Sequence, residues 1–204
     1  MSRYYPAYLN LQGRRSVVIG AGIIAERKVL QLLESDADIT LVSPEATPVL
    51  QELAGHGRLR WIRRAYAKGD LAGAWLAIAA TDDETVNRMV HEEAEREKTF
   101  LNVVDVTPLC GFIAPAVVER GPVTVAISTA GSSPALARKL RELMDGSQDP
   151  PHCEADTPYC RCLQWADAAE VLAAVRAEVR QRGATVSPEA WQAAMDESLL
   201  DMVR

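Results

Sequence analysis

A glycine-rich turn between an apolar strand and a helix is the feature that most constrains how this chain can fold. Residues 16–20 (SVVIG) are mostly apolar and β-branched, and the segment 20–25 (GAGIIA) continues directly from them. It matches the pattern G-x-G-x-x-G/A, in which Gly20 permits a tight turn, Gly22 lets the backbone approach a pyrophosphate and Ala25 lets the helix pack closely on the sheet. The first helical N–H groups would then face the phosphates. The turn predicts a dinucleotide site; the alternative is a tight strand-to-helix turn without a ligand.

Buried strands alternate with amphipathic helices over the N-terminal half of the chain. Segment 24–34 carries its apolar residues on one face, as expected of a helix packed on a sheet. Such alternation predicts a parallel sheet with helices on both faces. We expect further strands at 38–43, 74–80 and 100–104, an edge strand at 59–63, and helices near 48–55 and 83–98.

The pattern changes after residue 110. Segments 111–118 and 123–128 are strand-like and are separated by only four residues, which predicts an antiparallel pair. A helix is expected from Pro134 to about Asp145. Segment 146–162 contains three prolines and is interpreted as a linker, with two helices after it, one lined by Trp165, Leu172, Val175 and Val179 and the other by Trp191, Met195, Leu199 and Met202.

The charge and hydropathy of the chain limit its partners. Its 204 residues include 22 Lys and Arg against 28 Asp and Glu, so the formal net charge is −6. This acidic balance argues against nonspecific nucleic-acid binding, which depends on clustered basic residues. No apolar run approaches the roughly 18 residues that span a bilayer, and the first residues have no apolar signal-peptide core. We therefore expect a cytoplasmic protein without a membrane partner.

The residues after the second strand bear on the choice of cofactor. That strand ends at Ser43-Pro44-Glu45, and Glu45 lies about 20 residues beyond the glycine turn, the spacing of an acid that binds the ribose 2′-hydroxyl. Glu45 is equally well interpreted as an acid at the start of the next helix. No arginine adjoins it in the sequence to meet a 2′-phosphate, which favours NAD over NADP.

Four segments, in this order along the chain, resemble one known family. They are 20–28 (GAGIIAERK), 75–87 (WLAIAATDDETVN), 102–105 (NVVD) and 125–142 (VAISTAGSSPALARKLRE). Together they are similar to the precorrin-2 dehydrogenase family, of the siroheme synthase N-terminal type, over residues 5–145. The resemblance implies NAD-dependent oxidation of precorrin-2 to sirohydrochlorin, and some members of the family also insert ferrous iron into that product.

The resemblance also implies a domain order and an oligomeric state. We expect an α/β protein with an NAD-binding Rossmann domain over residues 1–112, a small α+β dimerisation region with a substrate-contacting loop over 113–146, and a linker with a C-terminal helical domain over 147–204. A homodimer is implied, with the two strands after residue 110 and the following helix as the paired or exchanged elements.

Asp105 follows the last strand of the predicted parallel sheet, where the ligand cleft of such a sheet opens. The resemblance places the key acidic residue of the active site here. A carboxylate can accept the proton released on dehydrogenation, or stabilise the positive charge left on the tetrapyrrole nitrogens. From the residues alone, Asp105 is equally well a turn residue in the segment 105–108 (DVTP).

Other small or polar residues at strand ends are candidates for cofactor contacts. The segment Thr81-Asp82-Asp83 can supply the N-cap of the next helix, for which Thr and Asp are good residues. Ala80 and Thr81 can also border the cofactor, and both interpretations can hold. Asn102 either bonds the nicotinamide ribose or carboxamide or stabilises a turn. The candidate cofactor-binding residues are Gly20, Gly22, Ile23, Ile24, Ser43, Pro44, Glu45, Ala80, Thr81 and Asn102.

A loop of small residues at 128–134 (STAGSSP) runs into a predicted helix. Its N–H groups suit an anion, and precorrin-2, the substrate that the resemblance implies, carries eight carboxylates. The alternative is ordinary helix capping, for which serine and proline are typical. The candidate substrate-binding residues are Ser128, Thr129, Gly131 and Ser132.

One histidine and three cysteines fall in the predicted linker: His152, Cys153, Cys160 and Cys162. Imidazole and thiolate suit Zn or Fe, but the spacing is irregular and contains no C-x-x-C pair. We interpret the segment as a linker with incidental cysteines and expect no dedicated metal site.

The sequence favours an NAD-dependent precorrin-2 dehydrogenase. Within the same family, the alternative is a bifunctional dehydrogenase and sirohydrochlorin ferrochelatase. From a different class, the alternative is a regulatory module that senses NAD(H) without turnover. Asp105 and the loop of small residues discriminate between enzyme and sensor, because a sensor needs neither.

Overall fold

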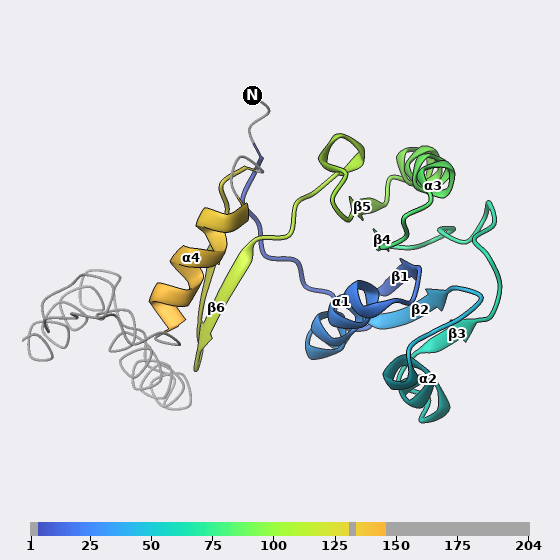
Figure 1. Cartoon of the computed structure of the whole chain (residues 1–204), viewed down its shortest axis with the longest axis horizontal. Coiled ribbons are helices and arrows are strands. Elements are labelled where there is room, and N and C mark those ends of the chain that lie inside the picture. Colours follow the sequence, from blue (N-terminus) through green and yellow to red (C-terminus); the bar gives the residue numbers. More distant parts are fainter. Residues whose placement is uncertain (1–3, 131–133, 146–204) are drawn as a thin grey trace, which may run out of the picture. The chain divides into compact units, whose positions relative to one another are not determined.

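The structure, a computed structural model, describes residues 4–130 and 134–145 (Figure 1). The chain divides into two compact units, Met1–Ala114 and Pro115–Arg204. The predicted linker, with His152, Cys153, Cys160 and Cys162, and the two predicted C-terminal helices fall outside the described residues. None of the helices in the described ranges has both the length and the apolarity to cross a bilayer.

The first unit is built on a five-stranded sheet in which all neighbouring strands are parallel. The strands are β1 (Arg15–Ile19), β2 (Asp38–Val42), β3 (Arg60–Ile62), β4 (Leu76–Ala79) and β5 (Phe100–Val103), in the order β3-β2-β1-β4-β5. The chain runs outward from β1 to β3 and then returns to the other side of β1 to form β4. This reversal beside β1 is the switch point at which ligands bind in open α/β sheets. The predicted parallel sheet is confirmed, and β3 is its edge strand as expected.

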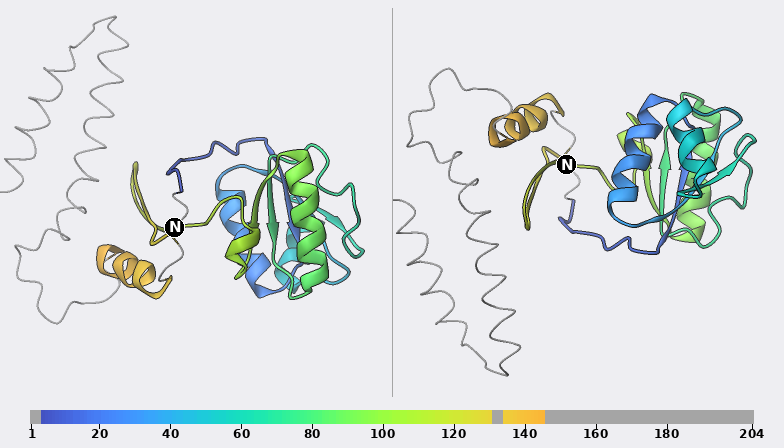
Figure 2. Two further views of the ribbon diagram at one scale, coloured as in Figure 1. Left: turned by 90° about the horizontal axis from the view of Figure 1, so that it is seen from above. Right: turned by 90° about the horizontal axis from the view of Figure 1, so that it is seen from below.

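Helices cover both faces of this sheet (Figure 2). On one face α1 (Ile23–Glu34) and α2 (Pro48–Gly55) pack over strand residues such as Val18 and Leu41. On the other face α3 (Glu84–Glu97) packs over residues such as Val17 and Val42. Because both faces are covered, successive residues are apolar within the strands, as in Val17–Ile19 of β1 and Leu76–Ala79 of β4, instead of alternating with polar residues. The α/β fold class is thereby confirmed.

The described part of the second unit is an antiparallel pair, β6 (Ala116–Arg120) and β7 (Val123–Ile127), with the helix α4 (Pro134–Asp145). The antiparallel pairing and the helix are as predicted, but the first strand is shifted. It was expected to begin at Gly111, yet the N–H groups of Gly111 and Phe112 both donate to the Leu101 carbonyl and keep this segment on β5. The strand instead begins at Ala116.

The same strand also extends further than expected. It continues through Arg120, which pairs with Val123, so only Gly121 and Pro122 form the turn. Gly121 has φ +50°, the conformation that the first position of a tight hairpin turn requires.

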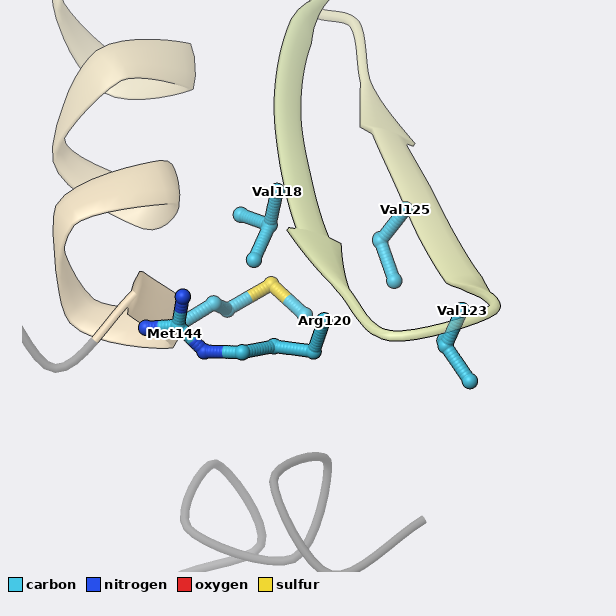
Figure 3. Close-up of a pocket in the computed structure, with 5 residues that line it drawn as sticks. All are labelled: Val118, Arg120, Val123, Val125 and Met144. Carbon is cyan, nitrogen blue, oxygen red and sulfur yellow. The ribbon is translucent and has the colours of Figure 1, made fainter. Parts of the chain in front are cut away.

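The helix α4 packs against one face of the β6–β7 hairpin. Met144 of α4 lies beside Val118 and the aliphatic stem of Arg120, and with Val123 and Val125 these side chains line a small apolar pocket (Figure 3). A two-stranded hairpin is marginal by itself and needs such a cover. The pocket is therefore part of the packing of α4 on the hairpin.

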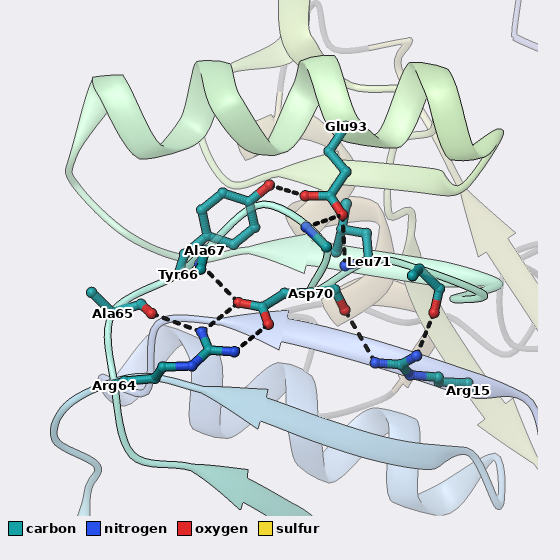
Figure 4. Close-up of polar contacts among 10 residues, drawn as sticks. Arg15, Arg64, Ala65, Tyr66, Ala67, Asp70, Leu71 and Glu93 are labelled. Carbon is teal, nitrogen blue, oxygen red and sulfur yellow. Dashed lines mark hydrogen bonds and ion pairs between the residues drawn. The ribbon is translucent and has the colours of Figure 1, made fainter.

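A buried carboxylate holds the long connection between β3 and β4 (Figure 4). Glu93, on the inner face of α3, is only 2% exposed. It accepts hydrogen bonds from the N–H groups of Gly69 (2.9 Å) and Leu71 (3.0 Å) and from the hydroxyl of Tyr66. Burial and the hydrogen bond to Glu93 raise the pKa of Tyr66, which keeps its hydroxyl protonated as a donor. Such partners are what permit a carboxylate to be buried.

An ion pair closes the same connection near its start. The guanidinium of Arg64 binds both carboxylate oxygens of Asp70, at 2.6 and 2.8 Å, and the N–H of Ala67 donates to one of these oxygens. Arg15 of β1 donates to the carbonyls of Asp70 and Ala72 (Figure 4). These contacts tie the connection to the first strand of the sheet.

We predict that Glu93→Ala lowers the free energy of unfolding by about 2–4 kcal/mol, because the buried N–H of Leu71 loses its acceptor. Urea denaturation measures the change. Glu92→Ala, an exposed neighbour on the same helix, is the control and should cost less than about 0.5 kcal/mol. Equal effects of the two substitutions would contradict the structural role of Glu93.

We also predict that Asp70 makes stability depend on acid pH. The hydrogen bonds from Arg64 hold the pKa of Asp70 below its ordinary value. As the pH falls, the unfolded chain therefore takes up this proton first, and the stability present above about pH 4 is lost progressively below it. Denaturation at pH 3 to 6 should show a shallower pH dependence for Asp70→Asn than for the wild type. Asp82→Asn, at an exposed position, should retain the wild-type dependence.

Candidate functional site

The ends of four parallel strands meet at one edge of the sheet. The N–H of Gly20, after β1, donates to the carbonyl of Val42 at the end of β2 (3.0 Å). The N–H of Ala80, after β4, donates to Ile19 (2.8 Å), and that of Val104, after β5, donates to Ala79 (2.9 Å). Ser43, Gly20, Ala80 and Val104 therefore follow one another along this edge, and Asp105 comes next after Val104. The structure thus brings most of the predicted cofactor residues together.

The two glycines of the turn have different reasons to be glycine. Gly20 has φ +89°, and a Cβ built on it would lie 2.3 Å from the carbonyl oxygen of Ala80. No side chain fits there, so Gly20 is required by the packing of the turn on the end of β4. A Cβ on Gly22 would meet no atom within 4 Å. The space in front of Gly22 is open to a ligand.

The N-terminus of α1 presents free donors to this space. Gly22 is the N-cap and no side chain caps the helix. The first hydrogen bond of the helix runs from Glu26 N–H to the Gly22 carbonyl (2.9 Å), so the N–H groups of the first turn, at Ile23 and Ile24, have no helical partner. Ala25 is fully buried and lets α1 lie close to the sheet, as predicted. Uncapped donors beside an open space form the kind of site that binds a phosphate.

The loop after β2 is attached to the glycine turn. Thr47, the N-cap of α2, donates its N–H to the carbonyl of Ala21 (3.1 Å) and its hydroxyl to the carboxylate of Glu26. Pro44 and Glu45, which precede Thr47 in this loop, are exposed. This position suits the predicted contact of Glu45 with a ribose, which stays a prediction.

The loop after β4 is held by a side chain that the sequence reasoning missed. Asn87, on the inner face of α3, donates from its amide to the carbonyl of Thr81 (3.0 Å). Asp83 is the N-cap of α3, within the segment where a cap was expected, and the Thr81 hydroxyl accepts from the Asp83 N–H. Asn87 is 4% exposed, and its buried amide oxygen has no hydrogen-bond partner among the described residues. The sequence offered one signal for this role: Asn87 is a polar residue at an inward-facing position of an amphipathic helix.

The segment after β5 is braced by Asn102 and Cys110. The Asn102 amide donates to the Phe112 carbonyl (3.1 Å) and contacts the Cys110 sulfur. The Cys110 thiol donates to the Val103 carbonyl, and burial raises its pKa, so it remains protonated. The Asn102 amide is thus used within the chain, and its predicted contact with the cofactor is still a prediction.

Asp105 occupies the turn that this brace supports. Its side chain is exposed and its φ is +60°, in the left-handed region that aspartate and asparagine tolerate better than most residues. The half-buried Lys28 of α1 is close enough to Asp105 for the two charges to interact. Burial lowers the pKa of Lys28 and the nearby Arg27 lowers it further, while the negative charge of Asp105 acts in the opposite direction. Asp105 is therefore within electrostatic reach of the helix that begins at the glycine turn.

The predicted substrate loop belongs to the second unit. The N–H of Ala130, which has φ +52°, donates to the hydroxyl of Ser128 (3.1 Å). Thr129 lies between them, whereas Gly131 and Ser132 are outside the described residues. Across residues 4–130 and 134–145, no group of three His, Cys, Asp or Glu side chains is placed to hold a metal ion.

Comparisons with known proteins agree with a dinucleotide-binding domain. A family described as "Putative NAD(P)-binding" matches residues 7–116, and the chain belongs to this family. A second family, described as "Sirohaem biosynthesis protein central", matches residues 120–147. The first match covers the sheet and the strand-end site, and the second covers most of the hairpin and α4.

Individual relatives are more informative than the family models, because they are named as siroheme synthases. The chain is 41% identical over 142 residues to siroheme synthase 3 of Aeromonas hydrophila, a match that covers 70% of this chain and 30% of the relative. It is 45% identical over 136 residues to siroheme synthase of Methylobacillus flagellatus, covering 67% and 29%. The chain thus spans less than a third of the length of these relatives.

A solved structure agrees with the fold over most of the chain. "SirC, precorrin-2 dehydrogenase" matches with a TM-score of 0.74 and 25% identity, covering 95% of this chain and 88% of that one. The resemblance expected from the four sequence segments is confirmed by these matches.

The two glycines give a prediction that separates folding from binding. Gly20→Ala should lower the free energy of unfolding by about 3 kcal/mol or more, because its Cβ overlaps the Ala80 carbonyl.

Gly22→Val should change the free energy of unfolding by less than about 1 kcal/mol, since Gly22 has extended backbone angles and open space. It should weaken NAD binding at least about tenfold by occupying the pyrophosphate space. Urea denaturation and calorimetric titration with NAD measure the two effects. A folded Gly22→Val protein with unchanged NAD affinity would contradict the cofactor assignment.

Proposed function

We propose that this chain is an NAD-dependent precorrin-2 dehydrogenase, which oxidises precorrin-2 to sirohydrochlorin in siroheme biosynthesis. The observation that carries the proposal is the position of Asp105. Its carboxylate is exposed in a left-handed turn at the carboxyl end of β5, on the same sheet edge as the open, uncapped turn at Gly22. The names of the relatives and of the matching solved structure support the choice of substrate.

The residues of the strand-end edge fit a dinucleotide. The N–H groups of Ile23 and Ile24 would hold the pyrophosphate in front of Gly22, and Ser43, Pro44 and Glu45 would border the adenosine ribose. Ala80, Thr81 and Asn102 would lie along the nicotinamide half. NAD, when bound, supplies the acceptor of the hydride that leaves precorrin-2.

Asp105 performs the second half of the oxidation. Loss of a hydride leaves a positive charge on the tetrapyrrole and a proton to be removed, and the Asp105 carboxylate accepts that proton. Lys28 adds positive charge within electrostatic reach of Asp105, which suits a substrate that carries carboxylates. Ser128, Thr129, Gly131 and Ser132 are proposed as further substrate contacts, on the strength of the family resemblance.

We also propose that the protein acts as a homodimer in the cytoplasm. The described part of the second unit has a sheet of only two strands, β6 and β7, so each has an edge without a partner strand in that sheet. An unpaired edge is a template for pairing with another strand. Sedimentation of the purified chain tests the oligomeric state.

The experiment that tests the function is incubation of the protein with precorrin-2 and NAD. The spectrum of sirohydrochlorin should appear together with NADH absorbance at a stoichiometric ratio. Binding of NAD without product would favour the sensor of NAD(H) instead.

We predict that Asp105→Asn lowers turnover by about 10²–10⁴-fold, the usual contribution of a positioned proton acceptor, while NAD affinity is unchanged. Asparagine keeps the size and the left-handed backbone, so the substitution removes only charge and basicity. The rate of sirohydrochlorin formation measures the effect.

Asp36→Asn is a matched control for this substitution. Asp36 is also an exposed aspartate with positive φ (+54°), but it precedes β2 at the opposite edge of the sheet. Its substitution should leave turnover unchanged. Near-normal turnover of the Asp105→Asn protein would remove Asp105 from the chemistry and leave it a turn residue.

A further inference from the structure

Two consecutive arginines follow the edge strand β3, and they have different surroundings. Arg64 is bound to the carboxylate of Asp70 through both of its terminal nitrogens. The guanidinium of Arg63 instead lies over the ring of Trp61, with its central carbon 4.1 Å from the ring centroid. Among the residues that the structure describes, no carboxylate lies within ion-pair distance of Arg63. Its positive charge is exposed and is held by an aromatic ring.

Trp61 attaches the stacked pair of Arg63 and Trp61 to the end of β2. Its indole N–H donates to the carbonyl of Ser43 (2.9 Å), and the Ser43 N–H donates to the carbonyl of Ile62 (3.2 Å). Ser43 is thus bonded on both sides to the segment that carries Arg63. Val42 of β2 pairs with Ile62 of β3, so Arg63, the next residue after β3, lies beside Ser43, the next residue after β2, on strands that are only about 5 Å apart.

The end of β2 is where a doubly wound fold meets the 2′-position of the adenosine ribose. A carboxylate there binds the hydroxyl of NAD, and an arginine nearby accommodates the phosphate of NADP. Here β2 is followed by Ser43, which has no charge, and Glu45 lies two residues further along an exposed loop. The positive charge comes instead from Arg63, which directly follows the neighbouring strand β3.

We propose that Arg63 binds an adenosine 2′-phosphate, so that this site takes NADP as well as NAD. The planar guanidinium can bind two phosphate oxygens at once. Its contact with Trp61 restricts the side chain before the ligand arrives, which reduces the entropy lost on binding. The proposal rests on the proposed function only in that the strand-end edge holds a nicotinamide dinucleotide.

The experiment is calorimetric titration of the full chain with NAD, NADP and adenosine 2′,5′-bisphosphate. The wild type should bind all three. Arg63→Gln should weaken NADP and the bisphosphate by about tenfold or more, the effect of losing hydrogen bonds to a charged group, and should change NAD affinity by less than about twofold. Arg63→Lys, which keeps the charge but not the fork, should be intermediate.

Arg60→Gln is the matched control. Arg60 is an exposed arginine at the other end of β3, paired with Thr40, so its loss changes the net charge equally but not the charge beside Ser43. It should leave all three affinities as in the wild type. Equal weakening by Arg60→Gln and Arg63→Gln would overturn the proposal in favour of a general charge effect.

Two further outcomes are distinguishable. Binding of NAD by the wild type without binding of NADP or the bisphosphate would overturn the role of Arg63 and leave the proposed function standing. Failure of all three nucleotides to bind would overturn the proposed function, and the role of Arg63 with it.

Discussion

The contact between Gly20 and the end of β4 is the constraint on which the rest of the site depends. Because Gly20 has no side chain, its backbone lies directly against the carbonyl of Ala80 at the point where the strand order reverses. This close approach brings the N-terminus of α1 and the loop after β4 to the same edge. A side chain at Gly20 would push β4 away from β1. Because β5 pairs with β4, Asp105, which follows β5, would move with it.

The inner face of α3 holds β4 at both ends. Before the strand, Glu93 accepts hydrogen bonds from the connection that includes Leu71. After it, Asn87 donates to the carbonyl of Thr81. Both side chains are buried, so each polar group has few alternatives to these bonds. One helix thereby helps to position both the start of β4 and the loop that follows it.

The remaining support of the site comes from the segment after β5. Asn102 and Cys110 bond the backbone of this segment to the strand, and the left-handed turn at Asp105 lies within it. A backbone conformation that most residues avoid persists only when its surroundings hold it in place. The exposed carboxylate is therefore presented by a braced loop, which suits a group that must meet a substrate in one orientation.

The sequence by itself determined the alternation of strands and helices, the glycine turn and the identity of Asp105 as a strand-end acid, because these follow from local periodicity and turn chemistry. It placed the start of β6 wrongly, since the bonds of Gly111 and Phe112 to Leu101 are not local. Only the tertiary structure decided that Gly20 serves packing while Gly22 leaves space, that Lys28 is within electrostatic reach of Asp105, and that Arg63 lies beside Ser43. The physical reason is that these neighbours belong to different strands and helices, and strand order and register, not distance along the chain, bring them together.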